Sequence, residues 1–245
     1  MKINKILENK VAYLSEQNLG NIEFAHLFVL LYRLLTFDSQ IYTLLHGSVA
    51  VTPNGNAILL GDGVDCLGKT MTSIMVGKSS GKYMVDECAL YNQATGSVYG
   101  NKNIPVHIRP NMIDKIERVF DLKMDNDKKF GAFILPEELG FEILETAKLK
   151  AIVSPKIVGE IKLEEEVNPM IKARKVAITA NAHHLKMLNS NLDRVDGKKD
   201  KGEKIELVDH TVGYSAPPSL IRLPYYDAYL KESEDIVKLL EKEGL

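Results

Sequence analysis

Residues 57–70 read Ala-Ile-Leu-Leu-Gly-Asp-Gly-Val-Asp-Cys-Leu-Gly-Lys-Thr, and the expected architecture follows from them. The first four residues are an apolar run typical of a buried strand, and residues 63–70 match the phosphate-loop pattern G-x-x-x-x-G-K-T. In such a loop the backbone N–H groups converge on the phosphates of a nucleotide, and the positive end of the following helix helps to hold their charge. The order of strand, loop and helix therefore predicts an α/β protein that binds a nucleoside triphosphate.

The loop pattern gives its residues distinct roles. Lys69 is expected to reach the outer phosphates, and the hydroxyl of Thr70 is expected to bind a magnesium ion. ATP and Mg²⁺ are therefore the expected cofactors. We expect nucleotide contacts from the whole stretch that runs from the first glycine into the helix, namely Gly63, Val64, Asp65, Cys66, Leu67, Gly68, Lys69, Thr70 and Met71.

The composition is that of an ordinary globular protein, with 45% hydrophobic residues and a formal net charge of −2. A nearly neutral chain offers no broad basic surface, so nucleic acid is not an expected partner. The longest apolar stretch, residues 24–35, contains His26 and Arg33, so we expect no membrane span. The two cysteines form no C-x-x-C pair, and no signal-peptide pattern follows the first lysines. These features favour a cytoplasmic protein.

Apolar periodicity and turn residues divide the chain into a helical N-terminal segment, residues 1–40, and a larger domain, residues 41–245. The sequence Thr-Pro-Asn-Gly-Asn at residues 52–56 joins two strands into a hairpin that leads into the phosphate loop. Residues 196–204 are charged and contain glycine, which predicts an exposed loop. We expect helices over residues 22–37, 69–76, 113–120, 143–149, 174–188 and 233–243, and strands over residues 42–45, 48–51, 57–60, 82–85, 89–91, 97–99, 130–135 and 150–153.

An acidic pair, Asp86-Glu87, ends the strand expected over residues 82–85. Because this strand follows the helix that begins at Lys69, a parallel neighbour of the first strand would bring the pair beside the bound phosphates. Phosphoryl transfer uses oxygen ligands for magnesium, and often a carboxylate that accepts the proton of the attacking hydroxyl. Two adjacent carboxylates can divide these tasks, whereas a helix cap or a surface turn is the structural alternative. His46 stands just before the hairpin, where a single histidine is usually structural.

These motifs together resemble a known family. The order of His46-Gly47-Ser48, the hairpin strand at residues 55–60, the phosphate loop, and Met-Val-Asp-Glu at residues 84–87 is similar to the core of the HPr kinase/phosphorylase catalytic domain. The resemblance extends roughly from residue 44 to residue 91. It implies the phosphoenolpyruvate carboxykinase type of P-loop fold, an α/β architecture with a mixed central sheet flanked by helices.

The resemblance also implies roles for individual residues. Asp86 would accept the proton of the acceptor hydroxyl, His46 would lie near the transferred phosphate, and Lys69 would hold the β and γ phosphates. Thr70, Asp86 and Glu87 would hold the metal. The acceptor would be the hydroxyl of a small metabolite or of a protein serine, and a homo-oligomer is expected because the family often forms oligomers. Arg109, Arg174 and Arg222 are the arginines to consider for a second phosphate contact.

Two features depart from the family pattern. Asp65-Cys66 stands where the family usually has Ser-Gly, which restricts the backbone and adds a negative charge near the phosphates. The downstream Glu-Arg-Gly signature has no clear copy, and residues 106–110 are its nearest candidate. We therefore expect an ATP-dependent kinase that is a divergent relative of the family. A nucleotide-binding regulatory protein with little or no transferase activity is the alternative, and a different P-loop hydrolase is disfavoured because no other apolar strand ends so clearly in acid.

Overall fold

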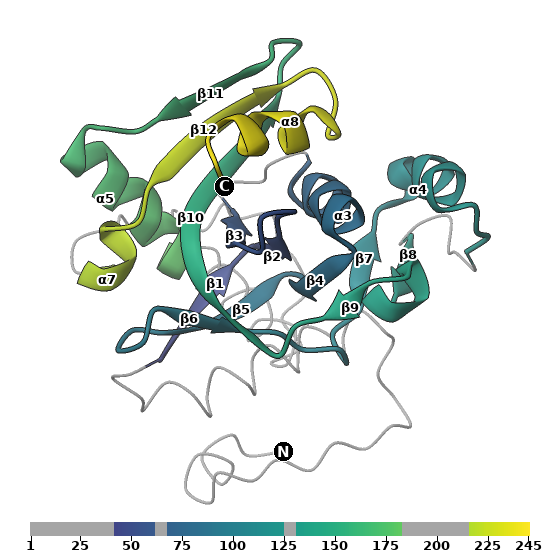
Figure 1. Ribbon diagram of the computed structural model, residues 1–245, viewed down its shortest axis with the longest axis horizontal. Helices are drawn as coiled ribbons and strands as arrows, with labels where there is room; N and C mark the ends of the chain where they lie inside the picture. The colour runs from purple at the N-terminus through teal and green to yellow at the C-terminus, as the bar shows by residue number, and fades with distance from the viewer. Residues whose placement is uncertain (1–41, 62–67, 125–130, 183–215) are drawn as a thin grey trace, which may run out of the picture.

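The computed structural model describes residues 42–61, 68–124, 131–182 and 216–245, which form a curled mixed sheet flanked by helices (Figure 1). The α/β class with a mixed, helix-flanked sheet is therefore confirmed, whereas the helix expected over residues 22–37 lies outside the described residues. The first elements in chain order are β1 (Tyr42–His46), β2 (Ser48–Val51), β3 (Ala57–Leu60), α3 (Lys69–Ser80), β4 (Lys82–Val85), β5 (Cys88–Asn92), β6 (Ser97–Tyr99), β7 (Val106–Ile108), η2 (Pro110–Met112) and α4 (Ile113–Phe120). The later elements are β8 (Ala132–Ile134), η3 (Pro136–Leu139), β9 (Glu142–Ile143), β10 (Thr146–Ile157), β11 (Lys162–Glu165), α5 (Pro169–Ala177), η4 (Ile178–Ala182), α7 (Pro218–Ile221), β12 (Tyr225–Leu230) and α8 (Asp235–Lys242).

The strand that leads into the phosphate loop lies in the middle of the sheet. β3 pairs in parallel with β10, which pairs in parallel with β12. On its other side β3 pairs with antiparallel β2, and β2 pairs with antiparallel β4. The tight turn between Thr52 and Asn56 brings β3 back alongside β2. β2 therefore lies between β3 and β4, so β4 runs in the same direction as β3 but does not pair with it.

One long strand, β10, joins two parts of the sheet. Its first residues pair with β6, which continues through β5 to β1 as an antiparallel meander, and its later residues pair with β3 and β12. The helix expected over residues 143–149 is therefore wrong. Ile143, Leu144 and Ala147 share a helix face by their spacing, but pairing of this segment with β4, β6 and β3 gives it strand partners and overrides local propensity.

The core lies on both faces of the sheet. Ala50, Ile58 and Leu60 pack toward the helices α3, α4 and α8, whereas Leu59 and Val49 pack toward the β1–β5–β6 meander and the helices α5 and α7. Successive residues of a strand point to opposite faces, so a strand that is covered on both sides must be apolar throughout. This explains why residues 57–60 read as an unbroken apolar run, and the strand expected there is confirmed.

The helix expected over residues 174–188 begins earlier than its periodicity indicated. α5 starts at Pro169, because the side chain of Asn168 accepts hydrogen bonds from the backbone N–H groups of Met170 and Ile171 at 3.0 and 3.3 Å. Asparagine at the N-cap followed by proline at the first helical position is a strong start signal. η4 continues the helix to Ala182, and residues 183–188 and the loop expected over residues 196–204 lie outside the described residues.

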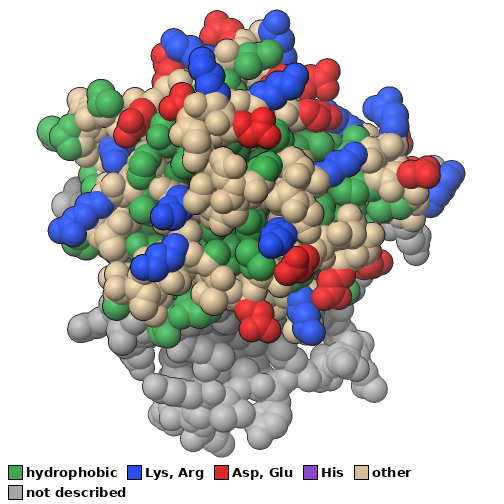
Figure 2. Space-filling model, viewed as in Figure 1, with side chains coloured by type: hydrophobic (Ala, Val, Ile, Leu, Met, Phe, Trp, Pro, Cys, Tyr) green, Lys and Arg blue, Asp and Glu red, His purple; other side chains and the backbone are tan. Residues whose placement is uncertain are grey.

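Most other expected elements are confirmed. The helix over residues 113–120 has the expected bounds, the β5–β6 hairpin forms with antiparallel pairing, and α8 occupies most of residues 233–243. The strand expected over residues 130–135 is shorter, and it pairs with β7 as a separate two-stranded sheet. On the face shown in Figure 2, basic and acidic side chains intermix over the described residues, as the net charge leads one to expect.

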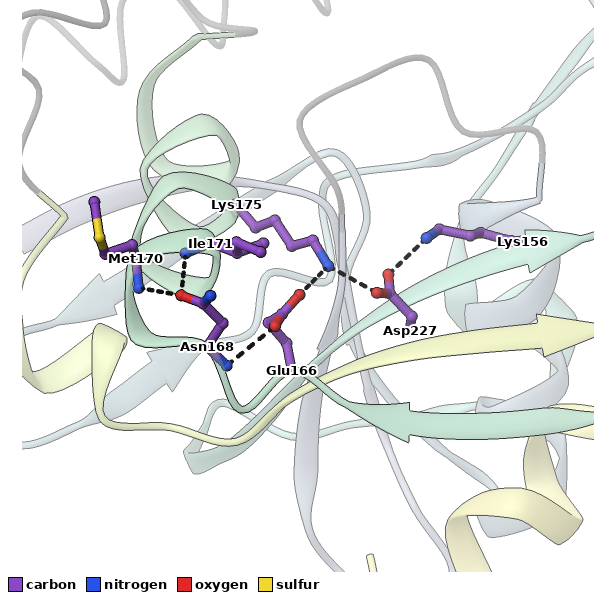
Figure 3. Close-up of polar contacts among 7 residues, drawn as sticks. All are labelled: Lys156, Glu166, Asn168, Met170, Ile171, Lys175 and Asp227. Atoms are coloured by element: carbon purple, nitrogen blue, oxygen red, sulfur yellow. Dashed lines mark hydrogen bonds and ion pairs between the residues drawn. The ribbon is translucent and has the colours of Figure 1, made fainter.

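A group of charged side chains ties α5 to the sheet (Figure 3). The carboxylate of Asp227 on β12 contacts Lys156 Nζ on β10 at 2.8 Å and Lys175 Nζ on α5 at 2.7 Å. Lys175 Nζ also contacts the carboxylate of Glu166 at 2.8 Å. Burial by itself would raise the pKa of Asp227, but the hydrogen bonds from the two lysines outweigh burial and lower it.

We predict that Asp227→Asn lowers the free energy of unfolding by about 1–2 kcal/mol at neutral pH, because two ammonium groups lose their shared anion. The folded-state pKa of Asp227 lies below the ordinary 3.8, so its stabilisation is present above that pH and is lost as the pH falls below it. Urea unfolding of both proteins at pH 7 and pH 3 measures the effect. Glu164→Gln, which alters an exposed ion pair on β11, is the control, and equal stability of Asp227→Asn and wild type at pH 7 would contradict the prediction.

Helix α3 approaches β4 closely at Gly77. A Cβ atom at this position would stand 2.9 Å from Cδ2 of Tyr83 and 3.4 Å from Cζ of Phe141, and these two rings stack on each other with centroids 5.4 Å apart. Glycine inside a helix is unfavourable by about 1 kcal/mol relative to alanine, so its presence here reflects the space that the tyrosine ring needs.

We expect Gly77→Ala to destabilise the protein by about 1–3 kcal/mol, because the cost of overpacking exceeds the gain in helix propensity. The midpoint of urea unfolding measures this change. Ser79→Ala, an exposed change in the same helix, should alter stability by less than about 0.5 kcal/mol. A Gly77→Ala protein that is more stable than the wild type would show that the contact with Tyr83 is not restrictive.

Candidate functional site

The motifs found in the sequence meet at one edge of the sheet. β3 and β4 both end there, and antiparallel β2 begins there between them. Ser48 pairs with Leu60, Val49 pairs with Val85, and the backbone N–H of Gly47 donates to the carbonyl of Glu87 at 3.2 Å. The tertiary structure thus places the His-Gly-Ser segment, the strand before the phosphate loop, and the acidic pair side by side.

Gly47 allows this close arrangement. A Cβ atom at residue 47 would lie 2.6 Å from the carbonyl oxygen of Leu60, a distance that no side chain tolerates. The glycine of the His-Gly pair therefore lets the chain turn from β1 into β2 while it stays against the end of β3. This close approach fixes His46 at the edge where the loop begins.

The described part of the phosphate loop is its last part. Gly68 stands at the N-cap of α3, and Lys69 and Thr70 occupy the first turn. The side chain of Met71 is buried in the core, so it contributes packing, and its backbone amide is the part suited to an anion. The remaining residues expected to contact the nucleotide, Gly63, Val64, Asp65, Cys66 and Leu67, lie outside the described residues.

His46 lies between Lys69 and Glu87. Its side chain is buried, with Nε2 3.3 Å from Lys69 Nζ and Nδ1 3.9 Å from Glu87 Oε2. An ammonium group has only donors, so Nε2 must act as the acceptor and the ring proton belongs on Nδ1, toward the carboxylate. His46 therefore links the lysine of the phosphate loop to the acidic pair, whereas its expected place near a transferred phosphate stays a prediction.

Asp86 is almost fully buried, with 1% of its surface exposed. Its Oδ1 shares a hydrogen bond with the hydroxyl of Ser48, and its Oδ2 accepts a hydrogen bond from the backbone N–H of His107 at 3.4 Å. Burial, together with the neighbouring charge of Glu87, raises the pKa of Asp86 to about 7, although these hydrogen bonds oppose the rise. A carboxyl group in this state can give and take a proton near neutral pH.

Glu87 differs from its neighbour in both exposure and backbone conformation. Its φ of 64° is in the left-handed region, which costs a residue with a side chain about 1–3 kcal/mol, and such strain is common at functional sites. Burial in the site raises its pKa, whereas the positive charges of Lys69 and Arg109 lower it. Since 43% of the side chain is in contact with solvent, water moderates this rise, and Glu87 is the member of the pair that is suited to bind a cation.

Residues 106–110, the nearest candidate for the Glu-Arg-Gly signature of the family, lie beside the acidic pair. The backbone of His107 contacts Asp86, and the exposed Arg109 acts on the carboxylate of Glu87. The His107 ring stacks on Phe133, its partner on β8, with centroids 4.6 Å apart. Of the three arginines considered from the sequence, Arg109 has this influence on the acidic pair, whereas Arg174 and Arg222 are exposed on α5 and just after α7.

Sequence reasoning missed three polar residues beneath the site. Ser48, Ser73 and Tyr83 are all buried. The Ser48 hydroxyl donates to Asp86 Oδ1, and the hydroxyls of Ser73 and Tyr83 share a hydrogen bond of 2.8 Å. The available signal was the presence of hydroxyl groups in segments that are otherwise apolar. A buried polar side chain needs a partner, so a tyrosine inside the strand that ends in the acidic pair is itself informative.

The residues expected to hold magnesium are compatible with a metal that the nucleotide helps to bind. Within the described ranges, no group of three or more His, Cys, Asp or Glu side chains could hold a metal ion on its own. Mg²⁺ usually takes one or two carboxylates and completes its shell with water and phosphate oxygens. Thr70, Asp86 and Glu87 supply one hydroxyl and two carboxylates at this edge, and each oxygen of Asp86 keeps a lone pair beyond its observed hydrogen bond.

We predict that Asp86→Asn stabilises the protein at pH 8 by about 1–3 kcal/mol in the absence of magnesium and nucleotide. The folded-state pKa of Asp86 is raised, so the acid favours folding at low pH and this contribution is lost as the pH rises through about 7. The ionisable groups that act on Asp86 are Glu87 and Tyr83, whereas Lys69, Arg109 and His46 lie around Glu87. Urea unfolding at pH 5 and pH 8 measures the difference, which should shrink at pH 5. A variant that is less stable than wild type at pH 8 would be the opposite result.

No known protein-family model matches the chain, and no curated protein matches it at a significant level. Among the helices within the described ranges, none is long and apolar enough to cross a membrane. Support for a function therefore comes from the residues of the site and from their arrangement.

Proposed function

We propose that the protein is an ATP-dependent phosphotransferase that moves the γ-phosphoryl group of ATP to a hydroxyl of a small metabolite or of a protein serine. The observation that carries the proposal is the convergence of Lys69, His46 and the acidic pair at the end of β3, with 3.3 Å between Lys69 Nζ and His46 Nε2. A phosphate-binding lysine beside a buried acid of raised pKa is the combination that phosphoryl transfer to a hydroxyl requires.

The roles follow from the environment of each group. Lys69 neutralises charge on the outer phosphates, and His46, held against Lys69 Nζ, orients it toward them. Asp86 accepts the proton of the acceptor hydroxyl as the oxygen–phosphorus bond forms and the bond to ADP breaks. Its raised pKa makes it a stronger base than an exposed carboxylate, and burial keeps bulk water away from it.

Magnesium and the acceptor fit the same arrangement. Thr70, Asp86 and Glu87 would hold Mg²⁺ together with phosphate oxygens, and the ion would neutralise charge that develops on the transferred group. We place the acceptor beside Asp86 on the side of β7, where the backbone of His107 contacts the carboxylate and Arg109 adds a positive charge. Arg109 is suited to an anionic group on the acceptor or to a phosphate of the nucleotide.

We further propose that the chain is a divergent relative of the HPr kinase/phosphorylase catalytic domain with a phosphoenolpyruvate carboxykinase-type fold. Support comes from the order of the elements: a His-Gly pair before β2, a β2–β3 hairpin, the phosphate loop, α3, and a strand that ends in Asp-Glu. The alternative is a nucleotide-binding regulatory protein with little transferase activity. It is favoured by Asp65-Cys66 in the loop, and it differs in requiring no base at Asp86.

We predict that Lys69→Ala abolishes transfer, because the outer phosphates lose the charge that holds them. The assay incubates protein, γ-labelled ATP and magnesium with an extract of the source cells and then separates proteins from small molecules. Lys78→Ala, a change of an exposed lysine in the same helix, should retain wild-type labelling. An active Lys69→Ala protein would contradict the proposed function.

Asp86→Asn distinguishes the kinase from the regulatory alternative. A kinase should lose at least about a hundredfold in transfer while its affinity for ATP changes little, because the amide cannot accept the proton. A regulatory protein would show ATP binding without labelling in wild type and variant alike. Label in a protein band identifies a protein acceptor, and label in the small-molecule pool identifies a metabolite.

A further inference from the structure

Strand β11 lies at an outer edge of the sheet, at the top of the view in Figure 1. Among the strands of the described ranges it pairs with β12 alone. Its side chains, from Lys162 to Glu165, are exposed or half-buried. The open side of such a strand is a template on which a strand of another chain can pair.

The hydrogen bonds of β11 with β12 show which of its backbone groups face outward. The N–H of Glu166, just after β11, donates to the carbonyl of Tyr225 on β12 at 2.8 Å. In an antiparallel pair, every second residue directs both its N–H and its carbonyl toward the partner strand. Glu164 therefore faces β12 as Glu166 does, whereas Leu163 and Glu165 direct their backbone groups outward.

Exposed apolar side chains gather around the same edge. Residues 157–171 hold six of the seven large apolar side chains that are exposed in the described part of the chain, so this surface is concentrated around β11. Val158 and Ile161 precede the strand with 57% and 50% of their surface exposed, and Val167 and Met170 follow it with 82% each. Apolar surface that gathers in one place is typical of a protein–protein contact.

The sequence of β11, Lys-Leu-Glu-Glu at residues 162–165, is complementary to a second copy of itself. Two antiparallel copies of one strand are related by a twofold axis, and residues that lie opposite each other share a face of the sheet, so the axis passes one residue of the strand. An axis at Leu163 puts Lys162 of each copy opposite Glu164 of the other. An axis at Lys162, Glu164 or Glu165 puts that residue opposite its own copy, which sets like charges against each other. The register centred on Leu163 is therefore the favourable one.

We propose that β11 is the contact strand of a homodimer, in which a second copy of the chain pairs antiparallel with the first about Leu163. The N–H and carbonyl of Leu163 in one copy then exchange hydrogen bonds with those of Leu163 in the other. Lys162 and Glu164 form an ion pair within one strand, and in the dimer they meet their counterparts to give charges of alternating sign on one face.

The apolar ends of β11 add the contact area that a short strand lacks. Pairing over four residues buries little surface, whereas stable interfaces bury about 1,200–2,000 Å² in total. Because the copies run antiparallel, the residues before β11 in one copy lie beside the residues after it in the other. Val158 and Ile161 of one copy thus come next to Val167 and Met170 of the other, and these exposed apolar side chains cover each other.

A dimer of this kind is separate from the proposed function. It needs none of the residues proposed to bind ATP or to move the phosphoryl group, so it does not rest on the transferase activity. Residues 157–171 also lie outside residues 44–91, over which the chain resembles the HPr kinase/phosphorylase domain, so the resemblance does not assign this surface.

Charge reversal tests the register. Sedimentation velocity of the full chain over a range of concentrations measures the dissociation constant of the dimer, whose mass should be twice the 27.4 kDa of one chain. Glu164→Lys brings two positive charges opposite each other and should raise the dissociation constant at least about tenfold, and Lys162→Glu should do the same. The double variant Lys162→Glu/Glu164→Lys should return to within about threefold of wild type, because its reversed pairs are again of opposite sign.

Glu142→Lys is the matched control for the charge change. Glu142 is an exposed glutamate on β9, at the other end of the sheet, and it forms an ion pair with Lys82. Its reversal alters net charge and breaks an ion pair as Glu164→Lys does, but it leaves β11 intact. The dissociation constant of the dimer should therefore stay at the wild-type value.

Glu165→Pro tests the backbone pairing, with Glu165→Ala as its charge-matched control. Because the N–H of Glu165 faces outward, proline removes no hydrogen bond to β12 but blocks pairing with a second copy. Glu165→Pro should be monomeric at concentrations at which Glu165→Ala is dimeric, and both should keep the circular dichroism spectrum of the wild type.

Three outcomes would overturn the inference. They are a wild-type chain that stays monomeric at every concentration, a dimer that folded Glu165→Pro leaves intact, and a double charge-reversal variant that associates no more tightly than the single ones.

Discussion

The pairing of β2 with β3 on one side and with β4 on the other is the constraint on which the site depends. β2 is antiparallel to both, so its beginning must lie where both neighbours end. His46 and Ser48 are carried to the carboxyl edge of the sheet for this reason, and Gly47 is needed because the carbonyl of Leu60 leaves no room for a side chain. The phosphate loop and the acidic pair then share one edge although a strand separates them.

This arrangement explains why two adjacent acids have different properties. Asp86 points into the interior, where Ser48 and a backbone N–H hold it and where burial raises its pKa. Glu87 takes a left-handed backbone conformation and lies half-exposed between His46 and the charge of Arg109. One carboxyl group is thereby suited to proton transfer and the other to charge neutralisation, which is a division of labour set by environment and not by residue type.

The sequence predicted the local elements of this region well, because their signals are local. The apolar run at residues 57–60, the turn at residues 52–56 and the acidic end of β4 each depend on nearby residues. Prediction failed at residues 143–149, where an apolar spacing that suits a helix belongs to a strand. The partners of that segment are β4, β6 and β3, which lie far away in the sequence, and no local pattern records them. The start of α5 was missed although Asn168-Pro169 signalled it.

The sequence by itself determined the chemistry that is available: a phosphate loop, a lysine, a histidine and two acids in a nearly neutral chain. Their types and spacing are those that the backbone conformation and charge of a phosphate-binding site would require. Only the tertiary structure decided which groups meet, because strand pairing and helix packing join residues that are distant along the chain. The contact of Lys69 with His46, the hydrogen bond from the His107 backbone to Asp86, and the hydrogen bond of Ser48 with Asp86 all arise in this way. They depend on burial, which is a property of the folded chain as a whole.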